Sequence, residues 1–376
     1  MYQLLVLPLL FLTFSPISNA LEDPEFFEIK IDREHPNRIY EEFEEFIVKY
    51  KRKYKNPAEK HMRLQNFIKT HNKVEEFNKN ASNTGHNTRF AINKFSDLSK
   101  KEFQSRFSKI VPDKANFTKP LKPFNSRRRH KREAEIVFEK SFDLRDIKVK
   151  NRYITTPAKD QGSCGCCWGF AAAAVAETVY AAYLGKNTVL SVQELCDCAT
   201  EGSLGCSGGK TEWGMGHIMG QGLSSALDYK WDENRANETG MCASHDTPRK
   251  FPEGKFDYHE INGYRAEYEM MAILTDWKSP IAVSFAVGER FRNYKNGTLY
   301  AHDCRNENPM QHHAGAIVGY GEEMVGRRMM PYWIVKNSWG DDWGNKGHFQ
   351  VVRGQDWCGI ESLKAFGGKI ADHTHA

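Results

Sequence analysis

Apolar residues in the first third of the chain recur at helical spacing. Residues 41–80 contain no glycine and a single proline, Pro57. Ahead of that proline, large apolar side chains follow one another at intervals of three and four positions, which is the period of one helix face. This stripe consists of Phe43, Phe46, Ile47, Tyr50 and Tyr54. The pattern predicts amphipathic helices before and after Pro57 that need a partner surface for their apolar faces.

The chain beyond residue 132 shows a different pattern, with one long helix followed by short strands. An alanine-rich run over residues 168–184 predicts a helix. Short apolar runs at 281–285, 314–321 and 331–338 are separated by glycine-rich turns, which is typical of strands. The chain as a whole is therefore predicted to be α+β, and its hydrophobic content of 40% is sufficient for a folded core.

An apolar run at the N-terminus, Met1–Ala20, ends in small residues. Ser18 and Ala20 stand at the −3 and −1 positions that signal peptidases recognise. The run is short for a bilayer, and no later segment is long enough, so we expect a signal peptide over 1–20 and no membrane span. A short N-terminal anchor is the alternative. A secretory route leads outside the cell or to a lysosome-like compartment, and it allows N-glycosylation of Asn-X-Ser/Thr sequons. The sequons are at Asn80, Asn116, Asn237 and Asn296.

Charge is distributed unevenly about residue 132. Residues 1–132 contain 27 Lys and Arg and 16 Asp and Glu, whereas residues 133–376 contain 26 and 32. A basic chain raises the question of nucleic acid, but here the basic part has an acidic remainder of the same chain as a partner. We therefore expect the two parts to bind each other, and we expect no nucleic acid.

The division falls at a basic run, RRRHKR, over residues 127–132. Its last four residues, from Arg129 to Arg132, resemble the Arg-X-Lys-Arg sites of furin-type proprotein convertases. The run follows a turn-rich stretch, as expected of an exposed linker. It predicts cleavage after Arg132, which would divide the chain into a propeptide, 21–132, and a mature domain, 133–376. A solvated basic run or a nucleic-acid arm is the alternative interpretation of these residues, and self-cleavage nearer Ser141 is the alternative route to a mature chain.

Three of the nine cysteines lie close together in QGSCGCCWGF, at Cys164, Cys166 and Cys167. An odd number of cysteines in an oxidising compartment implies disulfides and one unpaired thiol. Cys167 directly precedes the alanine-rich run, so it lies near a helix N-terminus, where the helix dipole lowers a thiol pKa. This position makes Cys167 the candidate nucleophile.

A thiolate nucleophile needs an imidazole and a group that orients the imidazole. His313 and Asn337 lie in two of the predicted strands, and Gln161 could donate its amide to an oxyanion. A zinc module is the competing hypothesis, but C-G-C-C with C-D-C lacks the usual paired spacing of zinc ligands. We therefore expect no metal and no cofactor.

These segments resemble the motifs of the papain family of cysteine proteases. QGSCGCCWGF is similar to the nucleophile motif, QHHAGAIVGYG to the histidine motif and KNSWG to the asparagine motif, in that order. The resemblance implies a papain-like fold of two subdomains, a helical left part and a β-barrel-like right part. It also implies catalytic roles for Cys167, His313, Asn337 and Gln161, and it places Trp339 as a shield over the His–Asn contact.

The helical N-terminal region resembles the inhibitory propeptide of the cathepsin L-like branch. AINKFSD, at residues 91–97, is similar to the second signature of that propeptide, and the resemblance implies a zymogen whose own propeptide blocks the cleft. The first, interrupted helix signature is represented by Glu59, Arg63, Phe67, Val74 and Asn78.

The family resemblance also implies three disulfides. They pair Cys164 with Cys206, Cys198 with Cys242, and Cys304 with Cys358. Two further cysteines, Cys166 and Cys196, are extra to the family pattern. They form either a fourth disulfide or two buried free thiols, because sequence does not fix connectivity.

The resemblance implies an endopeptidase acting on protein or peptide substrates, inhibited by cystatin-like proteins and acting as a monomer. The stretch between Cys206 and Cys242 is too short for the insertion that closes the cleft in cathepsin B-like relatives, and we expect its His217 at the surface. A catalytically impaired homologue that acts as a binding protein is the alternative. The pocket for the substrate residue before the cleaved one maps to Lys210, Thr211, Ser284, Ala314 and Leu363.

Overall fold

The computed structural model describes the chain from residue 38 to residue 371, with gaps. The described residues are 38–108, 110, 138–199, 204–232, 242, 247–251, 254–261, 266–301 and 311–371. Several sequence predictions lie outside them, and these are the signal peptide, the sequons at Asn116 and Asn237, the processing residues Arg129 and Arg132, and Cys304.

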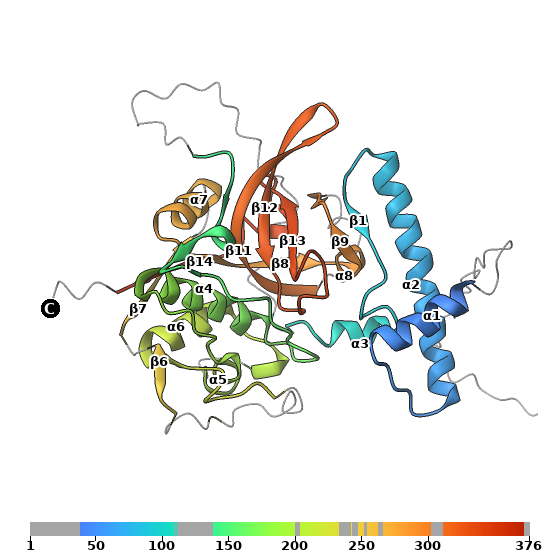
Figure 1. Ribbon diagram of the computed structural model, residues 1–376, viewed down its shortest axis with the longest axis horizontal. Helices are drawn as coiled ribbons and strands as arrows, with labels where there is room; N and C mark the ends of the chain where they lie inside the picture. Colours follow the sequence, from blue (N-terminus) through green and yellow to red (C-terminus); the bar gives the residue numbers. More distant parts are fainter. Residues whose placement is uncertain are drawn as a thin grey trace, which may run out of the picture.

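Two helices form the N-terminal pro-region, on the right of Figure 1, and pack through an aromatic cluster. The first, α1, is Arg38–Lys49 and the second, α2, is Pro57–Asn83. Asn56 caps α2 by accepting a hydrogen bond from the backbone N–H of Glu59 at 2.9 Å. The predicted stripe runs past the end of α1, so its last two tyrosines lie in the connecting segment but still pack against the cluster.

A short helix and a short strand continue the pro-region towards the rest of the chain. Helix α3, Lys100–Gln104, begins with a capping box between Ser99 and Glu102. Strand β1, Arg89–Phe90, pairs antiparallel with β9, Tyr294–Asn296. The pro-region is thus joined to the second half of the chain by backbone hydrogen bonds as well as by side chains.

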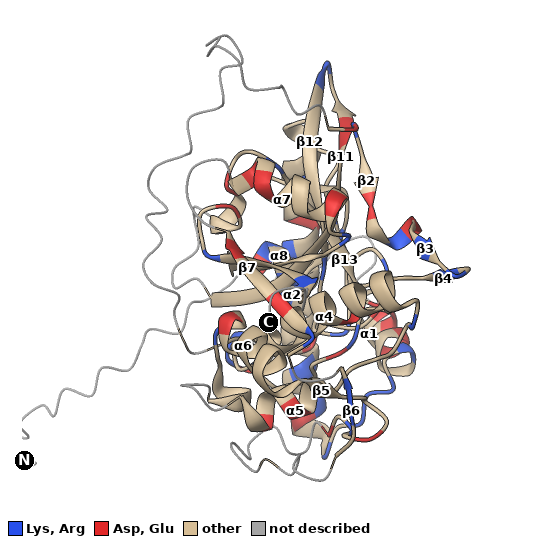
Figure 2. Cartoon of the chain, turned by 90° about the vertical axis from the view of Figure 1, so that its left-hand side faces the viewer, with Lys and Arg blue, Asp and Glu red and all other residues tan. Residues whose placement is uncertain are grey.

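Three helices make up one side of the second half, at the lower left of Figure 1: α4, Cys167–Leu184, α5, Val192–Cys198, and α6, Thr211–Gln221. Helix α4 carries a single charged residue, Glu177, so its ribbon is almost entirely tan in Figure 2. It is the one helix of the described chain long and apolar enough to cross a membrane, but 83% of it is buried inside the protein. It therefore serves as the central core helix.

A sheet of eight strands forms the other side. Its order is β10-β13-β12-β11-β8-β14-β7, with β2 paired to β11, and all pairs are antiparallel except β10 with β13. The strands are β2, Phe142–Asp143; β7, Phe256–Ile261; β8, Ile281–Val287; β10, Thr298–Leu299; β11, Gln311–Val325; β12, Arg328–Lys336; β13, His348–Val352; and β14, Ala365–Ile370.

The remaining elements lie outside the three core helices and the eight-stranded sheet. Two small sheets pair β3, Lys148–Val149, with β4, Arg152–Tyr153, and β5, Leu223–Ser224, with β6, Arg249–Phe251; the other helices are α7, Ala266–Asp276, and α8, Glu289–Arg292. Helices on one side and a mainly antiparallel sheet on the other confirm the α+β prediction.

Candidate active site

Cys167 is the first residue of α4 and is buried. It is the free cysteine of the described chain. Burial raises the pKa of its thiol to about 11, and backbone hydrogen bonds at Ala314, Trp168 and Ser108 oppose that rise only in part. The lowering of the Cys167 pKa that we predicted from the helix dipole was therefore wrong for this covered state, because the desolvation of the thiol raises its pKa instead.

His313 and Asn337 come together from neighbouring strands, since His313 lies in β11 and Asn337 directly follows β12. His313 Nε2 lies 2.7 Å from Asn337 Oδ1, which also accepts the backbone N–H of Ser338 at 2.8 Å. An amide oxygen only accepts, so Nε2 carries the imidazole proton and Nδ1 is the basic nitrogen. No described residue forms a hydrogen bond with that Nδ1. Burial lowers the pKa of His313 to about 4, so the imidazole is neutral.

Trp339 covers this pair. Its ring centroid lies 4.8 Å from that of His313, and the indole is fully buried. Three pro-region rings pack against the same indole, with centroid distances of 5.3, 5.5 and 5.8 Å for Phe95, Phe103 and Phe107. The pro-region and the active-site aromatic residues therefore form one continuous core.

Gln161 binds the pro-region directly. Its Nε2 donates to the backbone carbonyls of Arg106, at 2.8 Å, and Cys164, at 2.6 Å. Ser338 Oγ donates to Gln161 Oε1 at 2.5 Å, which holds the amide in this orientation. The backbone carbonyl of Arg106 thus accepts a hydrogen bond from the Gln161 amide, the group that we expected to stabilise a substrate oxyanion.

The pro-region continues across the site after Arg106. The Phe107 ring meets His313 edge to face with centroids 5.6 Å apart, and Ser108 forms an antiparallel bridge with His312. The propeptide backbone therefore passes over Gln161, His313 and β11, where it excludes water from the thiol and the imidazole. This cover adds to the burial by Phe285 and Trp339 of the peptidase part, and burial is the physical cause of both pKa shifts.

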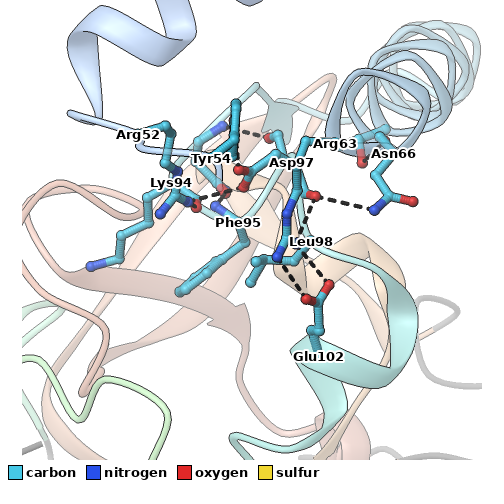
Figure 3. A network of polar contacts seen from close by, with 12 residues as sticks. Arg52, Tyr54, Arg63, Asn66, Lys94, Phe95, Asp97, Leu98 and Glu102 are labelled. Atoms are coloured by element: carbon cyan, nitrogen blue, oxygen red, sulfur yellow. Dashed lines mark hydrogen bonds and ion pairs between the residues drawn. The ribbon is translucent and has the colours of Figure 1, made fainter. Parts of the chain in front are cut away.

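The pro-region is held in shape by Asp97, which Figure 3 shows at the centre of a polar network. Its carboxylate accepts hydrogen bonds from Arg52 and from the hydroxyl of Tyr54, both at 3.0 Å. Its backbone carbonyl accepts from Arg63 at 3.3 Å and Asn66 at 3.2 Å. Asp97 belongs to the AINKFSD signature, so that motif fixes the turn that carries Phe95 to Trp339.

A buried polar network joins the two sides of the second half beneath the site. Lys336, the last residue of β12, donates to the carbonyl and hydroxyl oxygens of Thr156 at 2.7 and 2.8 Å. Thr156 Oγ1 donates to Glu177 of α4 at 2.5 Å, and Lys159 forms an ion pair with the same carboxylate. Because Asn337 follows Lys336, this network ties the Asn337 backbone to the helix that carries Cys167. Sequence reasoning missed it, since none of these residues belongs to a recognised motif.

The residues assigned to the substrate pocket are only partly brought together. Ala314 and Ser284 are cross-strand neighbours in β11 and β8, and Ala314 is buried. Lys210 precedes α6, and its ammonium lies 5.7 Å from the Trp213 ring centroid. Thr211 is buried and its hydroxyl has no hydrogen-bond partner in the described chain; Leu363 is buried as well.

His217 is not the surface residue that the sequence suggested. Its side chain is only 9% exposed, and its Nε2 lies 3.8 Å from Glu194 Oε1. Burial lowers the pKa of His217 to about 4. The prediction was wrong because the turn of α6 that carries His217 packs against the fully buried Glu194 of α5.

The cysteines pair as the family resemblance implies where they are described. Disulfides join Cys164 to Cys206 and Cys198 to Cys242, and Cys358 is also disulfide-bonded. The two extra cysteines are joined to each other as well, by a Cys166–Cys196 disulfide that links the residue before the nucleophile to α5. The structure therefore selects the disulfide over two free thiols.

This extra disulfide also explains why residue 169, in the first turn of α4, is a glycine. A Cβ on Gly169 would lie 2.9 Å from Cys166 Sγ, closer than side chains tolerate. We expect Gly169→Ala to lower the free energy of unfolding of the proenzyme by about 1–3 kcal/mol. In a protein that also carries Cys166→Ala and Cys196→Ala, Gly169→Ala should leave the free energy of unfolding nearly unchanged or raise it by up to about 1 kcal/mol, because alanine favours the helix more than glycine does.

Urea unfolding of the parent, the glycine variant, the double cysteine variant and the triple variant measures the coupling between Gly169 and the disulfide. Equal effects of Gly169→Ala with and without the disulfide would contradict this coupling.

The fold and the site define a cysteine protease in its proenzyme form. The chain belongs to the papain family: residues 138–367 match the family described as "Papain family cysteine protease", and residues 43–103 match "Cathepsin propeptide inhibitor domain (I29)". It is a cysteine endopeptidase with its inhibitory propeptide, as the sequence motifs indicated.

Named relatives agree with this assignment. The chain is 32% identical over 328 residues to the oryzain gamma chain of Oryza sativa subsp. japonica, covering 86% of this chain and 82% of that protein. It is 29% identical over 335 residues to a cathepsin L-like proteinase of Phaedon cochleariae, covering 86% and 91%. Among solved structures, the digestive procathepsin L2 proteinase from Tenebrio molitor larval midgut is similar with a TM-score of 0.71 and 28% identity, covering 88% of this chain and 99% of that one.

Proposed function

We propose that this endopeptidase hydrolyses peptide bonds through a Cys167 thiolate and a His313 imidazolium. The observation that carries the mechanism is the His313–Asn337 contact of 2.7 Å, which orients the ring and leaves Nδ1 as its basic nitrogen. Once the pro-region leaves, water returns to the site and removes the desolvation that keeps both groups neutral. The proton of the thiol then passes to the imidazole.

The reaction follows from these positions. Cys167 Sγ attacks the scissile carbonyl carbon, and the negative charge that develops on its oxygen is stabilised by the backbone N–H of Cys167 and the amide of Gln161. The C–N bond breaks as His313 protonates the leaving amine. A water molecule deprotonated by His313 then hydrolyses the thioester and restores the thiol. Asn337 orients the ring throughout, in the role that an aspartate has in serine triads, and Trp339 keeps water from the His–Asn contact.

Labelling with an epoxide thiol inhibitor tests this proposal. The processed protein should acquire one inhibitor adduct, and mass spectrometry should place it on Cys167. An adduct on another residue would show that the nucleophile is misassigned. A processed, folded protein that takes up no inhibitor would favour the catalytically impaired homologue.

We further propose that the zymogen matures by cleavage after Arg132. The described pro-region and the peptidase part are connected through the segment that contains the RRRHKR run, so cleavage there would leave both folded parts intact. N-terminal sequencing of the secreted protein should give a chain that begins at Glu133. Arg132→Ala should either move the N-terminus of the mature chain or prevent processing. An unchanged N-terminus in the variant would contradict cleavage by a proprotein convertase.

We propose that the pocket for the substrate residue before the cleaved one is bordered by Lys210, Thr211, Ser284, Ala314 and Leu363. The buried, unpartnered hydroxyl of Thr211 makes this pocket more polar than an aliphatic one. Lys210→Leu is expected to increase cleavage of peptides that carry Leu or Phe at this position and to decrease acceptance of acidic residues there, because it removes a positive charge. A peptide-library profile of both proteins measures this, and identical profiles would exclude Lys210 from specificity.

The cellular setting is part of the same proposal. We propose that the protein enters the secretory pathway, acts as a monomer and is inhibited by cystatin-like proteins. Asn80 on α2 is half-buried and Asn296 in β9 is exposed, so Asn296 is the more accessible of the two described sequons. A mobility shift after glycosidase treatment, lost in Asn296→Gln, would identify its glycan.

A further inference from the structure

Lys94 of the pro-region places its ammonium group between two carboxylates of the peptidase part. Its Nζ lies 2.6 Å from Asp160 Oδ2 and 2.9 Å from Asp342 Oδ1. The Lys94 side chain is 16% exposed, and in Figure 3 it extends away from the Asp97 network that shapes its own segment. This contact therefore joins the pro-region to the peptidase part, and it ends when the pro-region is removed.

Gly340 lies directly beneath this ammonium group. Its φ is +73°, and a Cβ at this position would lie 2.9 Å from Lys94 Nζ and 3.0 Å from Asp342 Oδ1. The Asp160 carboxylate is held in place as well, because its Oδ1 accepts the backbone N–H of Gly162 at 3.0 Å. Asp160, Gly340 and Asp342, here called the acidic cradle, thus leave room for one ammonium or guanidinium group between two carboxylates.

The acidic cradle draws its positive charge from the pro-region. Within the described residues, no basic side chain of the peptidase part forms an ion pair with Asp160 or Asp342. Asp341 lines the same hollow as these two residues. Removal of the pro-region therefore leaves three neighbouring carboxylates without a cation, and carboxylates placed in this way attract a positive group of a ligand.

The acidic cradle adjoins the catalytic groups. Asp160 directly precedes Gln161, whose amide we place at the oxyanion, and it forms an antiparallel bridge with Trp339. Asp342 lies three positions after Trp339, whose ring centroid is 4.8 Å from that of His313. The cradle is therefore close to the histidine that protonates the leaving amine.

This placement puts the cradle where the leaving part of the substrate binds. The pocket for the residue before the cleaved one is assigned to other residues, among them Ala314 and Thr211. The substrate chain after the cleaved bond begins at His313, which gives its proton to the leaving amine, and continues past Trp339. An extended residue covers roughly 3.3 Å, so the first three residues after the cleaved bond come within reach of the two carboxylates.

We propose that Asp160 and Asp342 form a subsite of the mature enzyme for a lysine or arginine among the first three substrate residues after the cleaved bond. Lys94 occupies this subsite in the proenzyme and shows which kind of group fits it. Arginine suits the same place, because a guanidinium can donate to both carboxylates at once. The inference rests on the proposed function, since it concerns the substrate of the same active site.

Internally quenched peptides test the subsite. They share one sequence before the cleaved bond and carry Lys, Arg, Gln or Glu at each of the three positions after it in turn. At one of these positions the processed parent should cleave the Lys or Arg peptide with a kcat/KM about tenfold above that of the Gln peptide, because each half-exposed ion pair contributes up to about fivefold. Glu should be the poorest residue at that position.

The double variant Asp160→Asn, Asp342→Asn should lose this preference. Its ratio of kcat/KM for the Lys and Gln peptides should fall to within about twofold of one, because the amides carry no charge. The matched control, Asp276→Asn with Glu322→Gln, neutralises two exposed carboxylates on α7 and β11 and changes the net charge equally. The control should keep the ratio of the parent.

The parent protein provides a second measurement, should the double variant fail to fold or to be processed. Its preference for Lys over Gln should fall severalfold between about 20 mM and about 500 mM salt, because ion pairs between partly exposed groups are screened. A preference that does not change with salt would contradict an ionic subsite.

Three further results would overturn the proposal. Equal kcat/KM for Lys and Gln peptides at all three positions would show that the carboxylates serve only to hold Lys94 in the proenzyme, and the proposed protease function would still stand. An equal loss of preference in the control variant would assign the preference to net charge. A parent protein that hydrolyses none of the peptides and is not labelled by the epoxide inhibitor would contradict the proposed function, and this inference with it.

Discussion

Cys167→Ala is expected to lower peptide hydrolysis by the processed enzyme by about 10⁴-fold or more, since removal of a covalent nucleophile costs that much in enzymes of this kind. The proenzyme should still fold, because the Cys167 side chain makes no disulfide and the change removes one sulfur atom from the cleft. The rate constant with a fluorogenic peptide, after processing by an added protease, gives the result.

The matched control leaves the Cys167 thiol and removes its neighbour. A Cys166→Ser, Cys196→Ser protein should keep most of the hydrolytic activity, with a loss of stability from the missing cross-link. If this protein were inactive while Cys167→Ala retained hydrolysis, the nucleophile would have to be reassigned within QGSCGCCWGF.

Alkylation of Cys167 by iodoacetamide should be slow in the proenzyme and fast after the pro-region has been removed. Only thiolate reacts, and burial raises the pKa of the covered Cys167 thiol to about 11. At pH 7 such a thiol is ionised in about one molecule in 10⁴, so the rate ratio between mature and proenzyme should be on the order of 10³–10⁴.

The pH dependence of this reaction separates ionisation from simple shielding. For a thiol with a raised pKa, thiolate appears only as the pH rises, so the proenzyme rate should increase about tenfold per pH unit from 6 to 9. The mature enzyme, with its proton on His313, should show a rate that is nearly flat over the same range. A proenzyme rate that is slow but independent of pH would mean that the thiol is already ionised beneath the propeptide.

The candidate catalytic residues could be selected from the sequence because they are particular residue types at fixed positions along the chain. Cys167 before an apolar helix, a histidine that starts a strand and an asparagine that ends another are local patterns. The match of residues 138–367 to the papain family of cysteine proteases confirmed the resemblance. The α+β fold followed from the same periodicities, since helix and strand spacing record which faces are buried.

Helix limits were less well predicted. The apolar stripe continued to Tyr54, yet α1 ends at Lys49. The stripe reports burial rather than helix, and Tyr54 is half-buried because its hydroxyl reaches Asp97, 43 positions later in the chain. A contact of that sequence separation leaves no periodic signal.

The sequence by itself determined which residues can perform the chemistry, because reactive groups and hydrophobic periods are properties of neighbouring positions. The tertiary structure alone decided the Cys166–Cys196 pairing, the need for glycine at position 169, the burial of His217 and the direction of the Cys167 pKa shift. Each of these depends on what lies within a few ångströms through space. The thiol shows the difference most plainly. Its place at a helix N-terminus follows from the sequence, but the burial that raises its pKa depends on segments far away along the chain, among them the pro-region around Ser108 and the strand that carries Ala314.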